Sequence, residues 1–250
     1  MADPLTLNLA VLFTLAFLVA GTVKGSVGLG LPTTALAIMT LVIDPRAAIA
    51  LVMIPMVVTN AWQVWRLGDI LGCARRYLPF SLALMVSVGV TVALTRDAPD
   101  RLLFAMLGIG ILFFVAVNSV IRVPVLPAWA DRPAQIATGL ICGVLGGMTS
   151  VWAPPMALYL AARRVPKDEF VRASGLLIFL GSLPLVIGFA AQNILTPRLA
   201  MVSAALLIPS LIGFSIGEVL RRKMSEAHFR AGLLIVFLIM GLNLLRRAIW

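Results

Sequence analysis

The sequence predicts an all-α polytopic membrane protein made of two inverted repeats, and three observations carry that prediction. Of the 250 residues, 61% are hydrophobic and only 12% are charged, whereas soluble domains carry about 25% charged residues. Apolar runs of the roughly 20 residues that cross a bilayer recur along nearly the whole chain. Two of these runs are interrupted by glycine and proline, one in each half. We therefore expect a single transmembrane domain over residues 1–250, with repeats of about 1–125 and 126–250.

Each half is expected to begin with a broken helical hairpin and to continue with three transmembrane helices. In the first half the first helix, the break, the short returning helix and the three spans are expected at 5–20, 21–34, 32–43, 47–64, 77–95 and 102–121. In the second half the corresponding elements are expected at 135–144, 146–155, 156–162, 170–191, 199–220 and 229–245. Glycine and proline mark the breaks, because both residues disrupt a helix interior.

The basic residues predict which loops share a side of the membrane. If each broken segment is a hairpin with both ends on one side, thirteen Lys and Arg residues fall in one set of loops and six in the other, with Lys24 at a hairpin tip. The more basic set is expected to be cytoplasmic, which places both chain ends outside the cytoplasm and inverts the second half. The alternative is a single crossing over 5–43 with parallel repeats. It scatters the basic loops over both sides, so we prefer inversion.

The two breaks are the expected substrate site. Irregular backbone at membrane depth survives where it is buried in protein or lines a wet cavity. The helices that follow Pro32 and Pro154 would direct the positive ends of their dipoles into it, which favours an anion. Lys24 adds a charge of the kind that is costly in a membrane and usually functional. The predicted substrate-binding residues are Lys24, Gly25, Ser26, Gly28, Gly30, Pro32, Thr33, Thr34, Gly146, Gly147, Thr149, Ser150 and Pro154, with Asn60 and Trp152 in a second tier.

The same residue types also have structural uses, and the sequence leaves these alternatives open. Glycines three or four apart in transmembrane helices allow close helix packing. The alternative role for Lys24 is to extend along its aliphatic stem to the membrane interface. Serine and threonine hydroxyls in apolar helices frequently bond only to their own backbone. The glycines that could serve either packing or substrate contact are Gly21, Gly25, Gly139 and Gly143.

Several classes of function are disfavoured. The chain has no Ser/His/Asp, His/Glu or Cys/His cluster, so we expect neither an enzyme nor a metal site, and no cofactor. Cys73 and Cys142 are expected to be free thiols. The net charge of +10 is expected to set membrane topology rather than to bind nucleic acid. No Asp or Glu lies in the middle of a predicted span, which disfavours carboxylate-based proton coupling.

Several of these motifs are similar to those of the sulfite exporter TauE/SafE family, also called the toluene sulfonate uptake permease group. They are the first break, the Asp44-Pro45-Arg46-Ala47 turn, the span carrying Asn60 and the second break before Pro154. The resemblance covers nearly the whole chain and implies a transporter of sulfur oxyanions or organosulfonates in the bacterial inner membrane. It implies that the site is formed by Gly25, Gly28, Gly30, Pro32 and Pro154. Trp152-Ala153 stands where we would expect a more glycine-rich turn, which implies a narrower cavity.

The predicted function is export of a small anion, sulfite or an organosulfonate, across the inner membrane. A negative cell interior drives an anion outward by about 2.3 kcal/mol per charge per 100 mV, so export needs no coupling ion. Uptake by the same fold, transport of a carboxylate, and a non-transporting membrane subunit are the alternatives. The expected partners are the anion and the lipid bilayer, and the oligomeric state stays open between a monomer and a homodimer.

Overall fold

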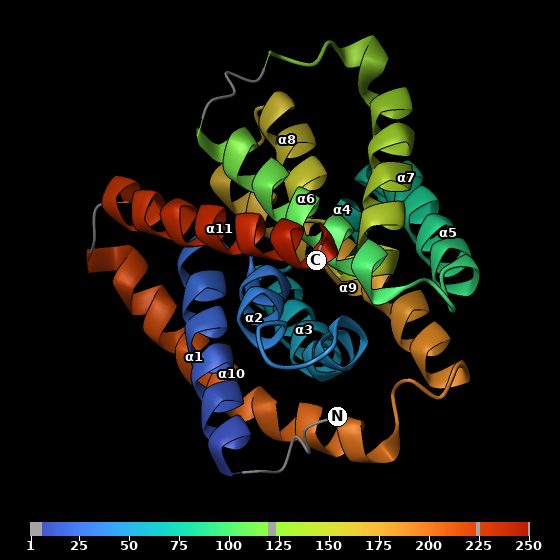
Figure 1. Cartoon of the computed structure of the whole chain (residues 1–250). Helices are drawn as coiled ribbons and strands as arrows, with labels where there is room; N and C mark the ends of the chain where they lie inside the picture. The colour runs from blue at the N-terminus through green and yellow to red at the C-terminus, as the bar shows by residue number, and fades with distance from the viewer. Residues whose placement is uncertain (1–6, 120–123, 224–225, 250) are drawn as a thin grey trace.

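The computed structural model describes residues 7–119, 124–223 and 226–249, and its regular elements in this part of the chain are all helical (Figure 1). The α-helices of the first half are α1 (Leu7–Val27), α2 (Leu31–Met39), α3 (Pro45–Leu67), α4 (Ile70–Arg76), α5 (Leu78–Leu94) and α6 (Asp100–Ser119). Those of the second half are α7 (Asp131–Thr149), α8 (Ala153–Ala162), α9 (Lys167–Ala191), α10 (Pro197–Lys223) and α11 (Glu226–Ile249), preceded by a 3-10 turn, η1 (Ala128–Ala130). The predicted all-α class is confirmed.

Four helices are each long and apolar enough to cross a membrane, namely α1, α3, α9 and α10. A fifth span is formed if α4 and α5, which meet at a bend of 77°, are taken together. The protein is therefore a multi-pass membrane protein. The spans expected at 102–121 and 229–245 fall on α6 and α11. Residues 120 and 121 lie outside the described part of the chain, and several side chains of α11 are not described.

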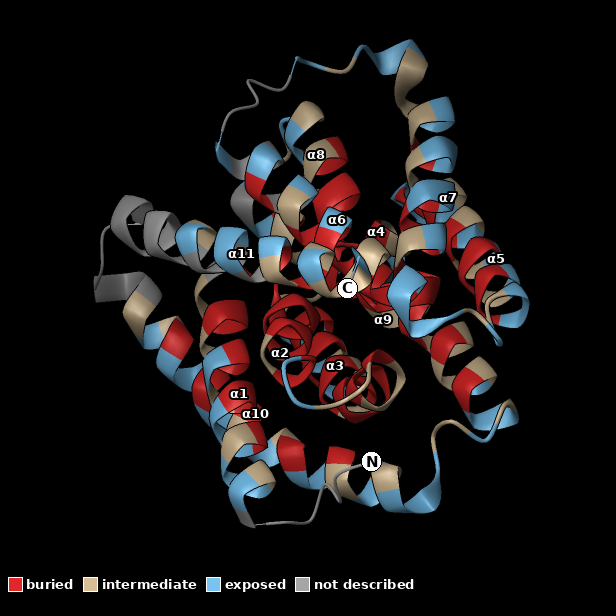
Figure 2. Cartoon of the chain, viewed as in Figure 1, coloured by how far each residue is buried: buried red, intermediate tan, exposed pale blue. Residues whose placement is uncertain are grey.

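The buried centre of the molecule is formed by α2 and α3, which are red over most of their length in Figure 2. Of the 18-residue apolar stretch of α3, 67% is buried inside the protein, compared with 33% for the corresponding stretch of α10. Around this centre α1 packs along α10, α5 along α7, and α6 along α11. The outer helices thus leave one face for lipid, while α3 is enclosed on most sides by protein.

Glycines set the two closest helix crossings. A Cβ atom at Gly21 would lie 2.2 Å from the Ser210 carbonyl oxygen, and one at Gly217 would lie 2.1 Å from the Thr22 carbonyl oxygen. These reciprocal contacts bring the backbones of α1 and α10 together. Gly21 lies against Ser210 and Gly25 lies against Phe214, so residue numbers rise in the same direction along both helices, which are therefore parallel. On the α5–α7 pair, a Cβ at Gly139 would lie 2.7 Å from the Phe80 carbonyl oxygen. Small residues allow this approach without lipid or side chains between the helices.

The second hairpin, α7–α8, has both of its open ends at one face of the molecule. The Asp131 carboxylate, where α7 begins, lies 2.9 Å from Arg163 Nε and accepts a 2.8 Å hydrogen bond from Tyr159 Oη. The chain leading to α7 is also joined to the end of α8, because the Leu126 N–H donates to the Ala162 carbonyl at 2.9 Å. The two helices therefore run in opposite directions.

Ion pairs collect at this same face, which we call the basic face. Arg76 Nη1 lies 3.0 Å from Glu169, and Arg172 Nη1 lies 2.9 Å from the other oxygen of that carboxylate. Arg66 Nη1 lies 3.2 Å from Glu218. The Arg76–Glu169 and Arg66–Glu218 pairs join the first half of the chain to the second. The arginines of these pairs belong to loops or helix ends that the charge count placed on one side.

The first hairpin, α1–α2, opens toward the opposite face, at the other end of α5. The Arg46 guanidinium donates hydrogen bonds to the carbonyls of Arg96 and Ala98 and lies 4.0 Å from Asp100 Oδ1. The turn that leaves α2 is thereby attached to the loop between α5 and α6. Since α1 is parallel to α10, and α10 ends near the basic face, α1 also begins at this opposite face.

The structure corrects three expected boundaries. The first helix runs to Val27 rather than ending at residue 20, because Gly21 and Gly25 lie inside it as packing positions against α10. The helix expected at 135–144 runs over Asp131–Thr149, so Gly146 and Gly147 are helical. The basic loop after α3 contains a short helix, α4, which the glycine and proline pattern did not indicate.

These contacts generate a topology prediction. Asp97 and Asp168 are both exposed and lie at opposite ends of the molecule. With the basic face cytoplasmic, an impermeant maleimide added to intact cells should label the Asp97→Cys variant, whereas Asp168→Cys should require permeabilised membranes. The unmodified protein supplies the background, since Cys73 and Cys142 are buried. Labelling of both variants from the same side would contradict the arrangement.

Candidate functional site

The first break consists of Gly28, Leu29 and Gly30, between the end of α1 and the start of α2. Gly28 has φ of 86° and Gly30 has φ of 101°, a region that glycine enters without the Cβ penalty of other residues. Gly28 closes α1, since its N–H donates to the Lys24 carbonyl at 2.7 Å. Pro32 lies in the first turn of α2, where the missing N–H removes no intrahelical bond.

Lys24 lies in the last turn of α1 and is only 1% exposed. Its ammonium donates a 2.6 Å hydrogen bond to Asn60 Oδ1, and Asn60 Nδ2 donates to the Met56 carbonyl at 2.7 Å. Among the residues that the structure describes, no carboxylate forms an ion pair with Lys24. The side chain therefore points into the protein rather than extending to the interface, and its charge has a neutral partner.

The second break consists of Ser150, Val151 and Trp152, between α7 and α8. Ser150 has φ of 57° and ends α7, with its N–H donating to the Gly146 carbonyl at 2.7 Å. The first turn of α8 contains both Pro154 and Pro155, which have no N–H. This helix N-terminus therefore offers fewer free donors than expected, and the two breaks are chemically unequal.

The predicted hydroxyl groups divide into two kinds. Ser26 Oγ donates to the Val23 carbonyl at 2.8 Å, and Thr149 Oγ1 donates to the Leu145 carbonyl at 2.6 Å, so both are engaged by their own helix. Thr34 Oγ1 and Ser150 Oγ are buried and have no hydrogen-bond partner. Thr33 is 2% exposed on the same first turn of α2. Thr34 and Ser150 are the hydroxyls left available to a ligand.

Two further unpartnered polar atoms lie on the elements around the breaks, Trp152 Nε1 and Gln63 Oε1. Gln63 lies one helical turn after Asn60 on α3, and its Nε2 donates to the Val171 carbonyl at 2.6 Å. Buried polar atoms in native proteins are nearly always hydrogen-bonded, so a group of orphans calls for a ligand or water. Gln63 was not among the predicted site residues, although its spacing from Asn60 places both on one helix face.

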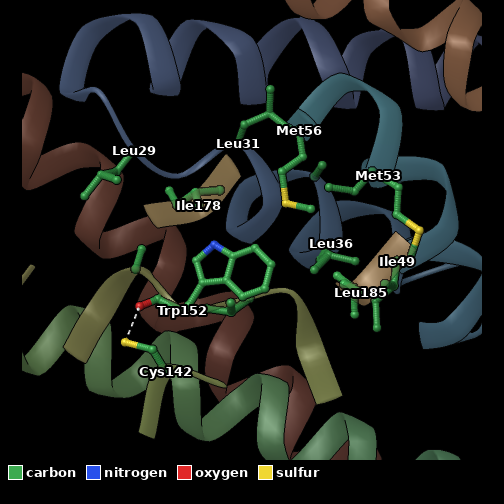
Figure 3. Packing of buried hydrophobic residues seen from close by; sticks show 14 of the residues in the cluster. Leu29, Leu31, Leu36, Ile49, Met53, Met56, Cys142, Trp152, Ile178 and Leu185 are labelled. Atoms are coloured by element: carbon green, nitrogen blue, oxygen red, sulfur yellow. Dashed lines mark hydrogen bonds between the residues drawn. The ribbon is translucent and has the colours of Figure 1, made fainter. Parts of the chain in front are cut away.

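Trp152 is 2% exposed and belongs to the same buried cluster as Leu29 and Leu31 of the first break. Figure 3 shows its ring among residues of α2, α3 and α9, including Leu36 and Met56. The second break thus contributes a large side chain to the surroundings of the first. The structure brings Lys24 and Asn60 into contact, and a Cβ at Gly30 would lie 3.0 Å from the Val23 side chain, so the start of α2 lies beside the last turns of α1. Ser150 and Trp152 belong to the second break.

Three of the predicted glycines have neighbours other than an open site. A Cβ at Gly25 would lie 2.1 Å from the Phe214 carbonyl oxygen, and one at Gly147 would lie 2.8 Å from Thr91 Cβ. A Cβ at Gly146 would lie 1.9 Å from Cε3 of Trp152. Gly25 and Gly147 therefore face packed helices, and Gly146 makes room for the indole ring.

The family described as "Sulfite exporter TauE/SafE" matches residues 13–244, which include both breaks and all the predicted site residues. The chain belongs to the sulfite exporter TauE/SafE family. Its members are membrane transporters of sulfite or sulfonate type, so this protein is a membrane transporter of a small anion. No curated protein and no solved structure matches the chain.

A substitution series separates packing glycines from the site. Gly25→Ala places a methyl group against the backbone of α10 and should destabilise the protein by about 1–3 kcal/mol, the usual effect of overpacking. Gly89→Ala is the matched control, because its Cβ would lie 3.9 Å from the nearest atom. Thermal unfolding of both purified variants in detergent should show a lower midpoint for Gly25→Ala alone. Equal midpoints would mean that the α1–α10 contact is looser than the structure has it.

Proposed function

We propose that this protein exports a small monovalent anion, an organosulfonate or sulfite in its singly charged hydrogen sulfite form, across the bacterial inner membrane. The observation that carries the proposal is the buried ammonium of Lys24, which has Asn60 as a neutral partner. A buried charge is costly unless a counter-charge and hydrogen bonds offset it. A bound anion would supply both the counter-charge and the hydrogen bonds.

Neutral donors near Lys24 would complete the coordination of the anion. The N–H groups of Leu31 and Thr33 belong to the first turn of α2, and such groups have no partner within the helix. The unpartnered Thr34 hydroxyl lies at the end of that turn. The helix dipole adds positive potential at the same point. Together these donors match the three acceptor oxygens of a sulfonate or sulfite group better than they match a cation.

The charge balance favours a monovalent anion. Lys24 is one unit charge, and the other donors are neutral. A sulfonate would be neutralised by it, whereas sulfate would keep one uncompensated charge in a buried place, where electrostatic interactions are strong. A carboxylate of similar size has the same charge, and it remains the second candidate for the substrate.

Transport between two sides is supported by the opposed hairpins. We propose that the two halves, about 1–125 and 126–250, are inverted repeats whose broken hairpins open toward opposite faces. The exchanged partners favour this relation, since α1 packs on α10 while the corresponding α7 packs on α5. A site between such halves is exposed alternately by rocking one against the other.

The direction proposed is outward. At a negative interior potential, export of one negative charge is favoured by about 2.3 kcal/mol per 100 mV. Uptake down a steep inward concentration gradient is the alternative for the same fold. A non-transporting membrane subunit is disfavoured by the family to which the chain belongs.

The test of this proposal replaces Lys24 by methionine, which removes the positive charge but keeps a long side chain. Lys24→Met leaves Asn60 Oδ1 without its donor, so we add the double variant Lys24→Met/Asn60→Leu, which removes both polar groups. In proteoliposomes loaded with methanesulfonate, both variants should lose efflux by roughly 10- to 100-fold, as expected for a hydrogen bond to a charged group worth about 1.5–3 kcal/mol.

Thermal unfolding of the same variants distinguishes binding from structural support. The double variant should be at least as stable as the parent, because replacing a buried polar pair by apolar groups of similar shape is nearly neutral or stabilising. Arg75→Ala, at an exposed position, is the matched loss of a positive charge and should leave efflux unchanged. Normal efflux from the double variant would exclude Lys24 from the site.

A further inference from the structure

We infer that Trp152 determines which anions the site accepts, because its indole N–H donates to the anion and its ring limits the group that the anion carries. The inference rests on the proposed function, since it assigns specificity within that same site. Trp152 comes from the second break, whereas Lys24 and the start of α2 belong to the first hairpin. The site is then complete only when the two halves meet.

The indole ring of Trp152 packs against the backbone of α7 at Gly146. Gly146 leaves the space that the ring occupies, since a Cβ there would lie 1.9 Å from Cε3 of Trp152. The main chain of Trp152 is fixed as well, because the Cys142 thiol donates to its carbonyl at 3.4 Å. Trp152 also precedes the two prolines of α8, which restrict the backbone next to it. A ring so positioned is preorganised for a ligand.

The indole nitrogen is the donor that lacks an acceptor. Trp152 is 2% exposed, and its Nε1 has no hydrogen-bond partner. Buried tryptophan N–H groups usually find an acceptor, so this orphan marks a place where an acceptor belongs. In Figure 3 the nitrogen lies on the side of the ring that is turned toward Ile178 and the first break. An anion held at the start of α2 would supply the acceptor oxygen.

The ring itself occupies the space that an organic substituent would need. Its neighbours in the buried cluster are aliphatic or thioether side chains from both halves, including Leu31, Met56 and Ile178. Such walls accept an apolar group, but the indole takes up much of the room between them. Small sulfonates should therefore bind better than bulky ones, and a smaller residue at position 152 should relax that preference.

Titration of purified protein in detergent tests both parts, with methanesulfonate and toluenesulfonate as probes and thermal stabilisation or calorimetry as the readout. Trp152→Phe keeps an aromatic ring but removes the N–H and some volume. Its affinity for methanesulfonate should fall by roughly 10- to 100-fold, the effect of losing one hydrogen bond to a charged acceptor. The affinity ratio of toluenesulfonate to methanesulfonate should rise at least several-fold, and Trp152→Leu should raise that ratio further.

Trp129→Phe is the matched control, because Trp129 is 83% exposed, and it should bind both probes as the parent does. Unchanged affinity and unchanged ratio in Trp152→Phe would overturn the inference while leaving anion binding intact. A parent protein that binds neither probe would instead overturn the proposed function. If Trp152→Leu does not fold, the two values for Trp152→Phe decide the outcome alone.

Discussion

The hydrogen bond between Lys24 and Asn60 is the interaction on which the rest of the site depends. An ammonium group that is 1% exposed would normally be paired with a carboxylate or would be excluded from the interior. The acidic residue of α10, Glu218, instead pairs with Arg66 at 3.2 Å. The ammonium of Lys24 therefore has no negatively charged partner among the described residues, and a bound anion could fill that role. The amide of Asn60 orients the ammonium but does not neutralise its charge.

Glycine has two separate roles in this fold, and together they place that charge. Gly21 and Gly25 bring α1 against the backbone of α10, which fixes where the last turn of α1 lies. Gly28 and Gly30 then reverse the chain through positive φ values so that α2 starts beside Lys24. The first role positions the helix and the second ends it. Loss of either would move the ammonium relative to the start of α2.

The sequence was informative about topology because charge and turns are local signals. The Asp44-Pro45-Arg46 turn and the 96–101 loop were assigned to one side from their low basic content, and Arg46 indeed contacts the carbonyls of Arg96 and Ala98. The breaks were placed within a few residues for the same reason. The extent of α1 was wrong, because a glycine that packs against a neighbour and a glycine that ends a helix look alike until the neighbour is known.

The unequal chemistry of the two breaks was only partly visible in the sequence. Pro154 and Pro155 could be read as a helix start that lacks two N–H donors. The burial of the Trp152 ring among residues of both halves depends on how the halves meet, which the sequence does not state. Ion pairs such as Arg76–Glu169 join residues 93 positions apart, and no periodicity marks them. Long-range pairing of this kind is decided by packing rather than by propensity.

The first two turns of α9 connect the site to the basic face. A Cβ at Gly28 would lie 3.2 Å from the Val171 side chain, and the Val171 carbonyl accepts from Gln63. The next residue, Arg172, pairs with Glu169 and donates to the Leu67 carbonyl at 3.2 Å. One helical turn therefore contacts the first break, α3 and the ion pairs between the halves. The position of that break and the ion pairs between the halves therefore depend on one set of contacts around Val171 and Arg172.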